Sequence, residues 1–167
     1  MAEDITPNVN RINEILQRTI EAIENSKEEI IEIVEQARNN VKIAEKELEE
    51  IKEQVEKVIK EVDELEIKEK KSRIYLANVN KNFNIYSEKD LKDAYDKANE
   101  IRIQLLLKRE MEKNLINKRR EQELILKSAF EVYEKAKKAW KSVSVVNEYL
   151  NGNLDEILFT VDNLNRK

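Results

Sequence analysis

The sequence predicts an all-α protein: a long antiparallel coiled-coil helical hairpin that dimerises into an elongated four-helix assembly. Three observations predict this fold. The 167 residues include only one Gly and one Pro, which leaves few tight turns and excludes sandwiches, barrels and doubly wound α/β folds. Apolar residues repeat at two heptad positions along the chain, as in a coiled-coil seam. The charges divide into two blocks of opposite sign.

A first helix is predicted over about residues 7–79. Thr6 and Pro7 form a typical helix start, because Thr caps free backbone N–H groups and Pro is tolerated at the first helical position. From Leu16 onward, apolar side chains occupy nearly every seam position of the heptad. Three polar residues interrupt this seam: Lys27, Glu69 and Ser72.

A chain reversal is predicted over residues 80–87. Four asparagines alternate through Asn78, Asn80, Asn82 and Asn84, and asparagine side chains compete with the helical backbone for hydrogen bonds. Ser87 then begins a capping-box-like start, in which its hydroxyl accepts from the N–H three residues on.

This turn also carries Phe83 and Tyr86, which make it a candidate docking site for a partner at an exposed end of the hairpin. The simpler interpretation is that the two aromatic rings seal the end of the coiled coil.

A second helix is predicted over residues 88–151, with a looser apolar seam. Four polar residues fall where the heptad calls for apolar ones: Lys108, Glu112, Arg119 and Gln122. Either the seam drifts onto neighbouring residues, as an inserted stutter would cause, or a polar layer lies in it. The drifted seam would use Met111, Ile116, Leu124 and Ile125.

The second helix is expected to end near Asn151 and Gly152, since glycine is favoured just beyond a helix C-terminus. Apolar residues resume their helical spacing from Leu154 to Leu164. Residues 1–152 are therefore interpreted as a coiled-coil domain, and residues 153–167 as the start of a connector helix to a further domain.

The charge blocks favour an antiparallel hairpin over a parallel pair of rods. Residues 21–66 contain sixteen acidic and seven basic side chains, and residues 102–141 contain twelve basic and six acidic ones. A reversal near residue 83 sets residue i opposite about residue 167 − i, which aligns the two blocks.

Further apolar side chains outside the seam call for more helices, and a dimer of hairpins would cover them. The alternative is an ordinary scatter of exposed aliphatic residues.

The composition also limits the chemistry. With no His and no Cys, the chain can form no His-based triad, thiolate nucleophile, thiol or imidazole metal site or disulfide. No catalytic, cofactor or metal site is expected, and no apolar run approaches the length of a membrane span. The basic stretch 108–120 lacks aromatic residues, so it is expected to complement the first helix rather than to bind nucleic acid. The chain is expected to be cytoplasmic.

Two segments resemble a known family. These are Asn78-Val-Asn-Lys-Asn-Phe-Asn-Ile-Tyr-Ser-Glu-Lys-Asp-Leu-Lys-Asp-Ala-Tyr95 and Ser144-Val-Val-Asn-Glu-Tyr-Leu-Asn-Gly-Asn-Leu154. They are similar to the N-terminal sensor region of the DegS family of two-component histidine kinases, and the resemblance covers nearly the whole chain. It implies a cytoplasmic sensor that precedes a phosphoacceptor-histidine helix and an ATP-binding domain, with a DNA-binding response regulator as partner.

The resemblance also suggests how a signal would pass through the chain. An input would change the packing of the second helix, and a signal-transmission segment would carry that change onward. The segment comprises Tyr149, Leu150, Asn151, Gly152, Asn153 and Leu154. Two other classes stay open: a structural coiled-coil scaffold or arm like those of SMC proteins, and a ligand-binding helical bundle.

Overall fold

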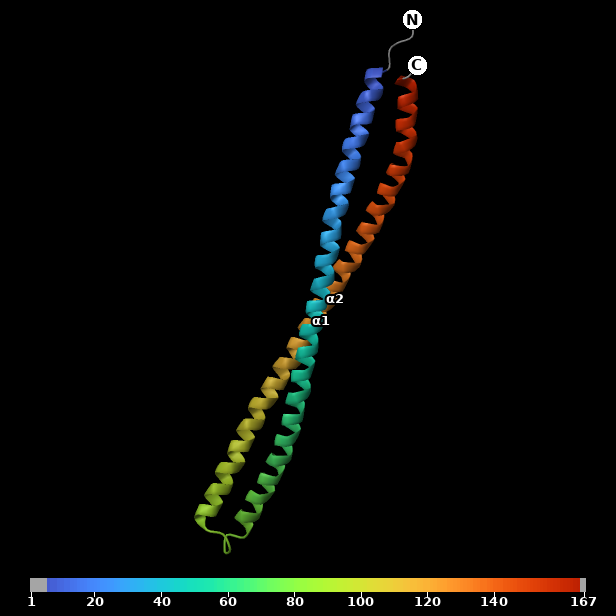
Figure 1. Ribbon diagram of the computed structural model, residues 1–167. Coiled ribbons are helices and arrows are strands. Elements are labelled where there is room, and N and C mark those ends of the chain that lie inside the picture. Colours follow the sequence, from blue (N-terminus) through green and yellow to red (C-terminus); the bar gives the residue numbers. More distant parts are fainter. Residues whose placement is uncertain (1–5, 166–167) are drawn as a thin grey trace. The chain divides into compact units, whose positions relative to one another are not determined.

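The computed structural model describes the backbone of residues 6–165. It also describes the side chains in that range, apart from those of residues 6, 8, 9, 154, 155 and 157–165. Two helices, α1 (Thr6–Lys81) and α2 (Glu88–Asn165), pack against each other as a helical hairpin (Figure 1). No strand occurs among the described residues. The all-α hairpin predicted from the sequence is thus confirmed, and its dimerisation stays a prediction.

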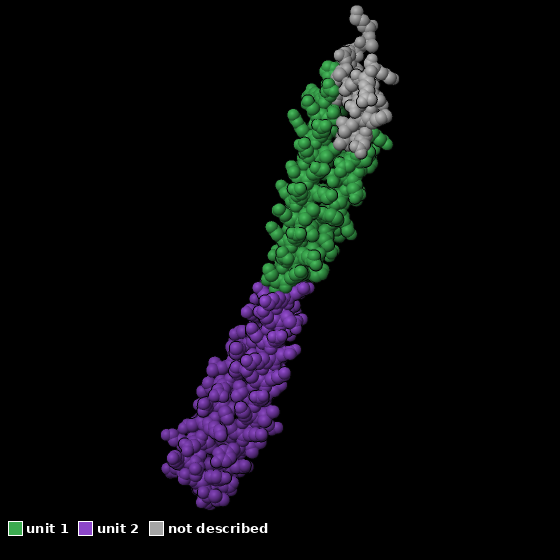
Figure 2. All heavy atoms as spheres, in the orientation of Figure 1, with its two compact units in different colours: residues 1–43, 127–167 green, residues 44–126 purple. Residues whose placement is uncertain are grey.

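The chain divides into two compact units, coloured separately in Figure 2. Unit 1 contains residues 1–43 and 127–167, and unit 2 contains residues 44–126. Each unit therefore takes one stretch from α1 and one from α2, and unit 2 also holds the turn that joins them.

The predicted boundaries of α1 are nearly correct. The helix begins at Thr6, one residue before the predicted start, and ends at Lys81, two residues after the predicted end. Asn78 and Asn80 stay helical, and the chain leaves the helix at Asn82, whose backbone N–H and side-chain amide both donate to the carbonyl of Asn78 (3.1 and 3.0 Å). Asn82 thereby satisfies a carbonyl that the end of the helix would leave without a partner.

α2 begins with the capping box predicted at Ser87. The Ser87 hydroxyl accepts from the backbone N–H of Asp90 (3.2 Å), while Asp90 Oδ2 accepts from both the backbone N–H and the hydroxyl of Ser87 (2.8 Å each). These hydrogen bonds hold the pKa of the Asp90 carboxyl below its ordinary value of 3.8, and the backbone N–H of Ser87 has the largest effect. The reciprocal bonds fix where α2 starts.

In unit 2 the heptad seam of α1 is buried as predicted. Val58 and Val62 form a core cluster with Leu105 of α2, and Leu65 and Leu115 pack against it. Each of the three central side chains is at most 6 % exposed. A narrow apolar stripe thus holds the two helices together in this unit.

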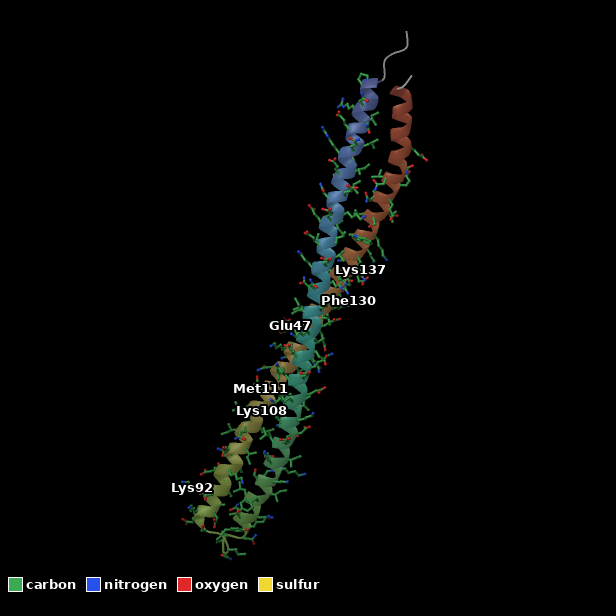
Figure 3. The ribbon with its side chains drawn as sticks, in the orientation of Figure 1. Glu47, Lys92, Lys108, Met111, Phe130 and Lys137 are labelled. Atoms are coloured by element: carbon green, nitrogen blue, oxygen red, sulfur yellow. The ribbon has the colours of Figure 1, made fainter. Side chains whose placement is uncertain are left out.

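In unit 1 the seam is mostly half-buried, and its α2 side contains bulkier and more polar residues. Ala37 and Val41 of α1 and Ala136 of α2 are buried. Tyr133 is half-buried, makes an edge-to-face contact with Phe130 (ring centroids 6.4 Å apart) and lies under the ammonium of Lys137, 4.5 Å from the ring centroid. Phe130 and Lys137 are labelled on α2 in Figure 3. These local contacts stabilise the helix surface beside the seam.

The predicted end of the second helix at Asn151 and Gly152 is wrong. α2 continues through both residues to Asn165, and Gly152 does not adopt a positive φ. A glycine ends a helix only when it takes up the left-handed conformation of a C-cap, and here it stays helical. The domain boundary proposed at residue 152 stays a prediction.

Candidate functional site

The polar residues of the α2 seam in unit 2 face α1, so the seam contains polar layers and does not drift. Lys108, Glu112 and Arg119 are half-buried and Gln122 is 7 % exposed, each at the position where the uninterrupted heptad places it. The residues that a drifted seam would bury do not replace them: Met111, Leu124 and Ile125 are exposed and Ile116 is half-buried. The structure thereby decides between the two interpretations that the sequence left open.

Two ion pairs join acidic α1 to basic α2 in unit 2. Lys108 Nζ lies 2.5 Å from Glu61 Oε2, and Arg109 Nη2 lies 2.7 Å from Glu66 Oε1. The hydrogen bond from Lys108 lowers the pKa of the Glu61 carboxyl. A reversal near residue 83 predicts that Glu61 lies opposite about residue 106, and its observed partner is Lys108, close to that position. Both ion pairs favour the antiparallel register.

Gln122 forms the most buried polar contact between the two helices of unit 2. Its side-chain amide donates to the backbone carbonyl of Ala44 (3.3 Å) and to Glu47 Oε2 (3.0 Å). Sliding one helix along the other would leave this buried amide without partners, which costs about 1–3 kcal/mol. Gln122 therefore specifies the pairing register at the expense of seam packing.

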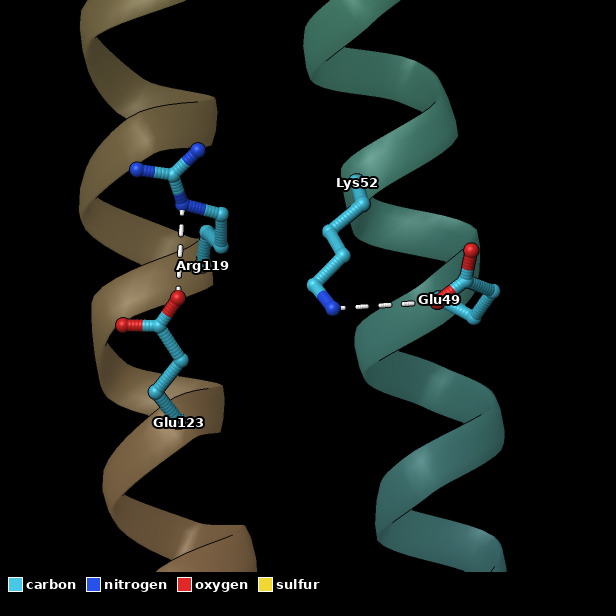
Figure 4. A network of polar contacts seen from close by, with 4 residues as sticks. All are labelled: Glu49, Lys52, Arg119 and Glu123. Atoms are coloured by element: carbon cyan, nitrogen blue, oxygen red, sulfur yellow. Dashed lines mark ion pairs between the residues drawn. The ribbon is translucent and has the colours of Figure 1, made fainter.

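Some other charges of unit 2 pair within one helix. Arg119 Nε lies 3.5 Å from Glu123 Oε1 on α2, without hydrogen-bond geometry, and Lys52 Nζ lies 3.8 Å from Glu49 Oε2 on α1 (Figure 4). Such exposed pairs contribute roughly 0–1 kcal/mol each. The contacts that specify the register are therefore the ones made by Glu61, Glu66 and Gln122.

In unit 1, the seam of α2 contains a buried polar residue whose bonding is incomplete. Asn147 is 6 % exposed, and its Oδ1 has no hydrogen-bond partner among the described residues. The hydroxyl oxygen of Ser144, one turn earlier in α2, is also buried and also has no hydrogen-bond partner among the described residues. Burying an unpaired polar group is unfavourable, so the packing here is weaker than an apolar seam would give. Asn147 lies two residues before the predicted transmission segment.

The transmission segment itself is an exposed part of α2. Tyr149 is 69 % exposed, Asn151 and Gly152 are exposed, and Leu150 and Asn153 are half-buried. The side-chain amide of Asn153 donates to the carbonyl of Tyr149 (2.8 Å), within the same helix. The sixth member, Leu154, has its side chain outside the described residues. The segment is thus a continuous helix with a single seam side chain, Leu150, among those described.

The two aromatic residues predicted at the turn differ in how far they are buried. Tyr86 is half-buried and packs edge-to-face on Tyr75 of α1, with ring centroids 6.4 Å apart. Phe83 is 70 % exposed. Sequence reasoning missed Ile85, which is 80 % exposed and could have been found as an apolar turn residue outside the heptad. Tyr86 therefore seals the end of the hairpin, and the exposed apolar pair is Phe83 and Ile85.

The described residues contain neither a cluster of metal ligands nor a membrane-spanning stretch. No group of three or more acidic side chains lies close enough together to hold a metal ion in this part of the chain. Neither α1 nor α2, over its described residues, has a stretch apolar enough to cross a bilayer.

The chain is similar to known signalling proteins over most of its length. Residues 13–167 match the family model described as sensor protein DegS. Two relatives are named signal transduction histidine-protein kinase/phosphatase DegS, one from Bacillus subtilis (strain 168) and one from Brevibacillus brevis. They are 32 % and 30 % identical to the chain over 146 residues, which is 87 % of this chain and 38 % of each relative. No solved structure matches.

The family match includes the turn, the polar residues of the α2 seam in both units and the transmission segment. The chain spans only 38 % of the length of the two relatives. The chain belongs to the DegS family of two-component sensor proteins.

Proposed function

We propose that this chain is the signal-sensing and signal-transmitting part of a cytoplasmic two-component histidine kinase, which controls a DNA-binding response regulator. The chain has no histidine, so any phosphoacceptor histidine would belong to a region outside it. We infer that the chain acts as a homodimer, because kinase dimerisation would bring two hairpins together. The relatives' names, which state kinase and phosphatase activity, support this proposal.

The observation that carries the transmission step is the incompletely bonded Asn147 in the seam of unit 1. A buried polar group without a hydrogen-bond partner destabilises the packing that buries it. The free energy of this packing of α2 on α1 therefore lies closer to that of alternative packings. An input that shifts α2 therefore needs little free energy to repack this region. Because α2 runs unbroken through Gly152, the shift would pass through Tyr149–Leu154 as a displacement of a helix and not as bending at a hinge.

The turn is the proposed docking point for an input protein. Phe83 and Ile85 expose apolar side chains at the end of unit 2, and the bonds of Asn82 and the Ser87–Asp90 capping box hold the backbone between them in place. Exposed apolar side chains on an ordered backbone lose little conformational entropy when a partner covers them.

The transmission step is tested with Asn147→Leu in the full-length kinase. Removing the unpaired buried polar group should stabilise the seam by about 1–2 kcal/mol and fix one packing of α2. The rate of autophosphorylation, followed with labelled ATP, should then differ from that of the unmodified protein by at least several-fold. The matched control is Asn117→Leu, the same change at an exposed position of α2, which should leave the rate unchanged.

Two results would contradict the proposal. If the full-length protein has no phosphoacceptor histidine and does not react with ATP, it is no kinase, and a scaffold or SMC-like arm becomes the better interpretation. If it is a kinase but Asn147→Leu and Asn117→Leu behave alike, the seam at Asn147 does not transmit the signal.

A further inference from the structure

A groove of about 430 Å³ lies beside the seam of unit 2, between α1 at Ser72, one of the three polar interruptions of its heptad, and the α2 residues opposite. Its walls are formed by Lys68, Lys71 and Tyr75 of α1 and by Lys97 of α2. We call this site the lysine groove. Its volume falls within the range of about 300–1,000 Å³ that small-molecule sites occupy.

The lysine groove exists because small side chains leave the seam unfilled. Ser72 lies where the heptad calls for a large apolar residue, and Ala94 of α2 also lines the groove. Ser72 is half-buried, and its hydroxyl donates to the backbone carbonyl of Glu69 (2.9 Å), so it turns back on its own helix rather than reaching across to α2. Ala94 is 5 % exposed and Ile101 half-buried, which gives the groove an apolar floor.

The charge of the lysine groove is positive only. Three lysines line it and no acidic residue does, and none of the three makes an ion pair or a side-chain hydrogen bond among the described residues. A neighbouring groove of about 460 Å³ shares Lys68 but includes Glu61 and Glu64, which balance its positive charge. The lysine groove is thus suited to an anion in a molecule whose net charge is −4.

The walls and floor together specify the class of ligand. Three lysines around one groove favour a carboxylate, sulfonate or phosphate, and the ring of Tyr75, which is 50 % exposed, offers an apolar face to a ring or short chain. We propose that the lysine groove binds a small organic anion from solution, with its charge among Lys68, Lys71 and Lys97 and its apolar part over Ala94 and Tyr75. This proposal does not depend on the kinase function, since binding to the groove requires only the hairpin.

Two matched dyes test the class of ligand. 8-Anilinonaphthalene-1-sulfonate carries a sulfonate on a naphthalene, and N-phenyl-1-naphthylamine has the same aromatic system without the charge. Fluorescence titration of the 167-residue chain should show tighter binding of the anionic dye, weakened by added NaCl because salt screens exposed charges. Amide chemical-shift changes caused by the anionic dye should centre on Ser72 and Ala94.

The lysines are tested with the double variant Lys71→Gln/Lys97→Gln. It should weaken binding of the anionic dye about fivefold to tenfold and leave the neutral dye unaffected. The matched control is Lys60→Gln/Lys92→Gln, which removes one exposed charge from each helix, with neither residue lining the lysine groove (Lys92 is labelled in Figure 3). This control should bind the anionic dye within about twofold of the unmodified chain.

A filling variant separates loss of the groove from loss of the fold. Ser72→Leu restores an apolar seam residue, so it should raise the melting temperature while abolishing binding of both dyes. The proposal is overturned if the two double variants weaken the anionic dye equally, or if Lys71→Gln/Lys97→Gln has no effect on it. It is also overturned if Lys71→Gln/Lys97→Gln dissociates a dimer of this chain but leaves binding of the anionic dye unchanged. A second copy of the chain would then be what occupies the lysine groove.

Discussion

At the scale of single residues, a few polar side chains define this hairpin more specifically than its apolar ones do. Val58 and Val62 could pack in several registers, because one aliphatic side chain resembles the next along a heptad. Gln122 and Glu61 cannot, since each has a particular partner on the other helix. The capping box plays the same part at the turn, where it fixes the residue at which α2 begins.

The capping box gives a prediction about pH. The pKa of Asp90 is lowered by its hydrogen bonds from Ser87, so the ionised carboxyl stabilises the folded state. That stability is fully present above the ordinary value of 3.8 and is lost as the pH falls through the lower pKa of the folded chain. An NMR titration of the Ser87 amide proton should therefore show its midpoint below pH 3.8.

Ser87→Ala provides the control for this titration. Without the hydroxyl, the carboxyl of Asp90 loses one of its hydrogen bonds, and its midpoint should move up toward 3.8. A midpoint at or above 3.8 in the unmodified chain would mean that the capping box does not stabilise the ionised form.

At the scale of elements, α2 differs from α1 in how it uses its seam. The α1 seam is almost wholly aliphatic from Ala37 to Val62, whereas the α2 seam carries half-buried or buried polar residues in both units, including Lys108, Gln122 and Asn147. Lys108 and Gln122 have partners on α1 and so specify the register, whereas Asn147 keeps a buried Oδ1 without a hydrogen-bond partner among the described residues. The packing of α2 on α1 is therefore least stable around Asn147.

Gly152 gives a prediction about the end of α2. It is helical, and a Cβ added to it would meet nothing within 4 Å, so Gly152→Ala should introduce no clash. Alanine is more favourable than glycine inside a helix by about 1 kcal/mol. Hydrogen exchange of the amides over residues 149–156 should slow about fivefold in the variant, which corresponds to that free energy.

The matched control is Ala139→Gly, the reverse change at an exposed position of the same helix, which should speed exchange around residue 139 by a similar factor. If Gly152→Ala speeds exchange instead, Gly152 is not helical in solution. The helix end that the sequence predicted near Gly152 would then be the better interpretation.

At the scale of the whole molecule, the chain exposes more apolar side chains than a two-helix hairpin needs. Many of the apolar side chains outside the heptad seam are exposed, and Ile116 is half-buried. The exposed ones include Ile31, Ile33, Ile43, Ile59, Ile67, Ile74, Leu106, Leu107, Leu124, Phe130 and Val146. Scattered exposed aliphatics are common in single proteins, but so many on one hairpin favour burial against a second copy.

The corresponding prediction is a dimer in solution. Light scattering at micromolar concentration should give twice the 19.8 kDa mass of the chain. Replacing Leu107 and Leu124, which are 68 % and 65 % exposed, with Lys should shift the mass toward the monomer, while circular dichroism keeps its helical signal. A monomeric mass for the unmodified chain across this range would contradict the four-helix assembly.

The sequence alone predicted the hairpin, its reversal and most of its seam, because heptad spacing, turn residues and charge blocks are local patterns that the chain carries in order. It also predicted the capping box, since Ser87 and Asp90 are only three residues apart. It misplaced the end of α2, because the conformation of Gly152 depends on whether the flanking residues continue the helix, and a composition rule does not contain that information.

Only the tertiary structure decided what depends on the other helix. Whether Lys108 and Gln122 face the seam depends on Glu61, Ala44 and Glu47 lying opposite them, and these residues are 47 to 78 positions away in sequence. The lysine groove has the same origin, because it forms where Ser72 of α1 meets Ala94 of α2. Contacts between distant residues require the two helices to be brought into register, and spacing along a single helix cannot specify them in advance.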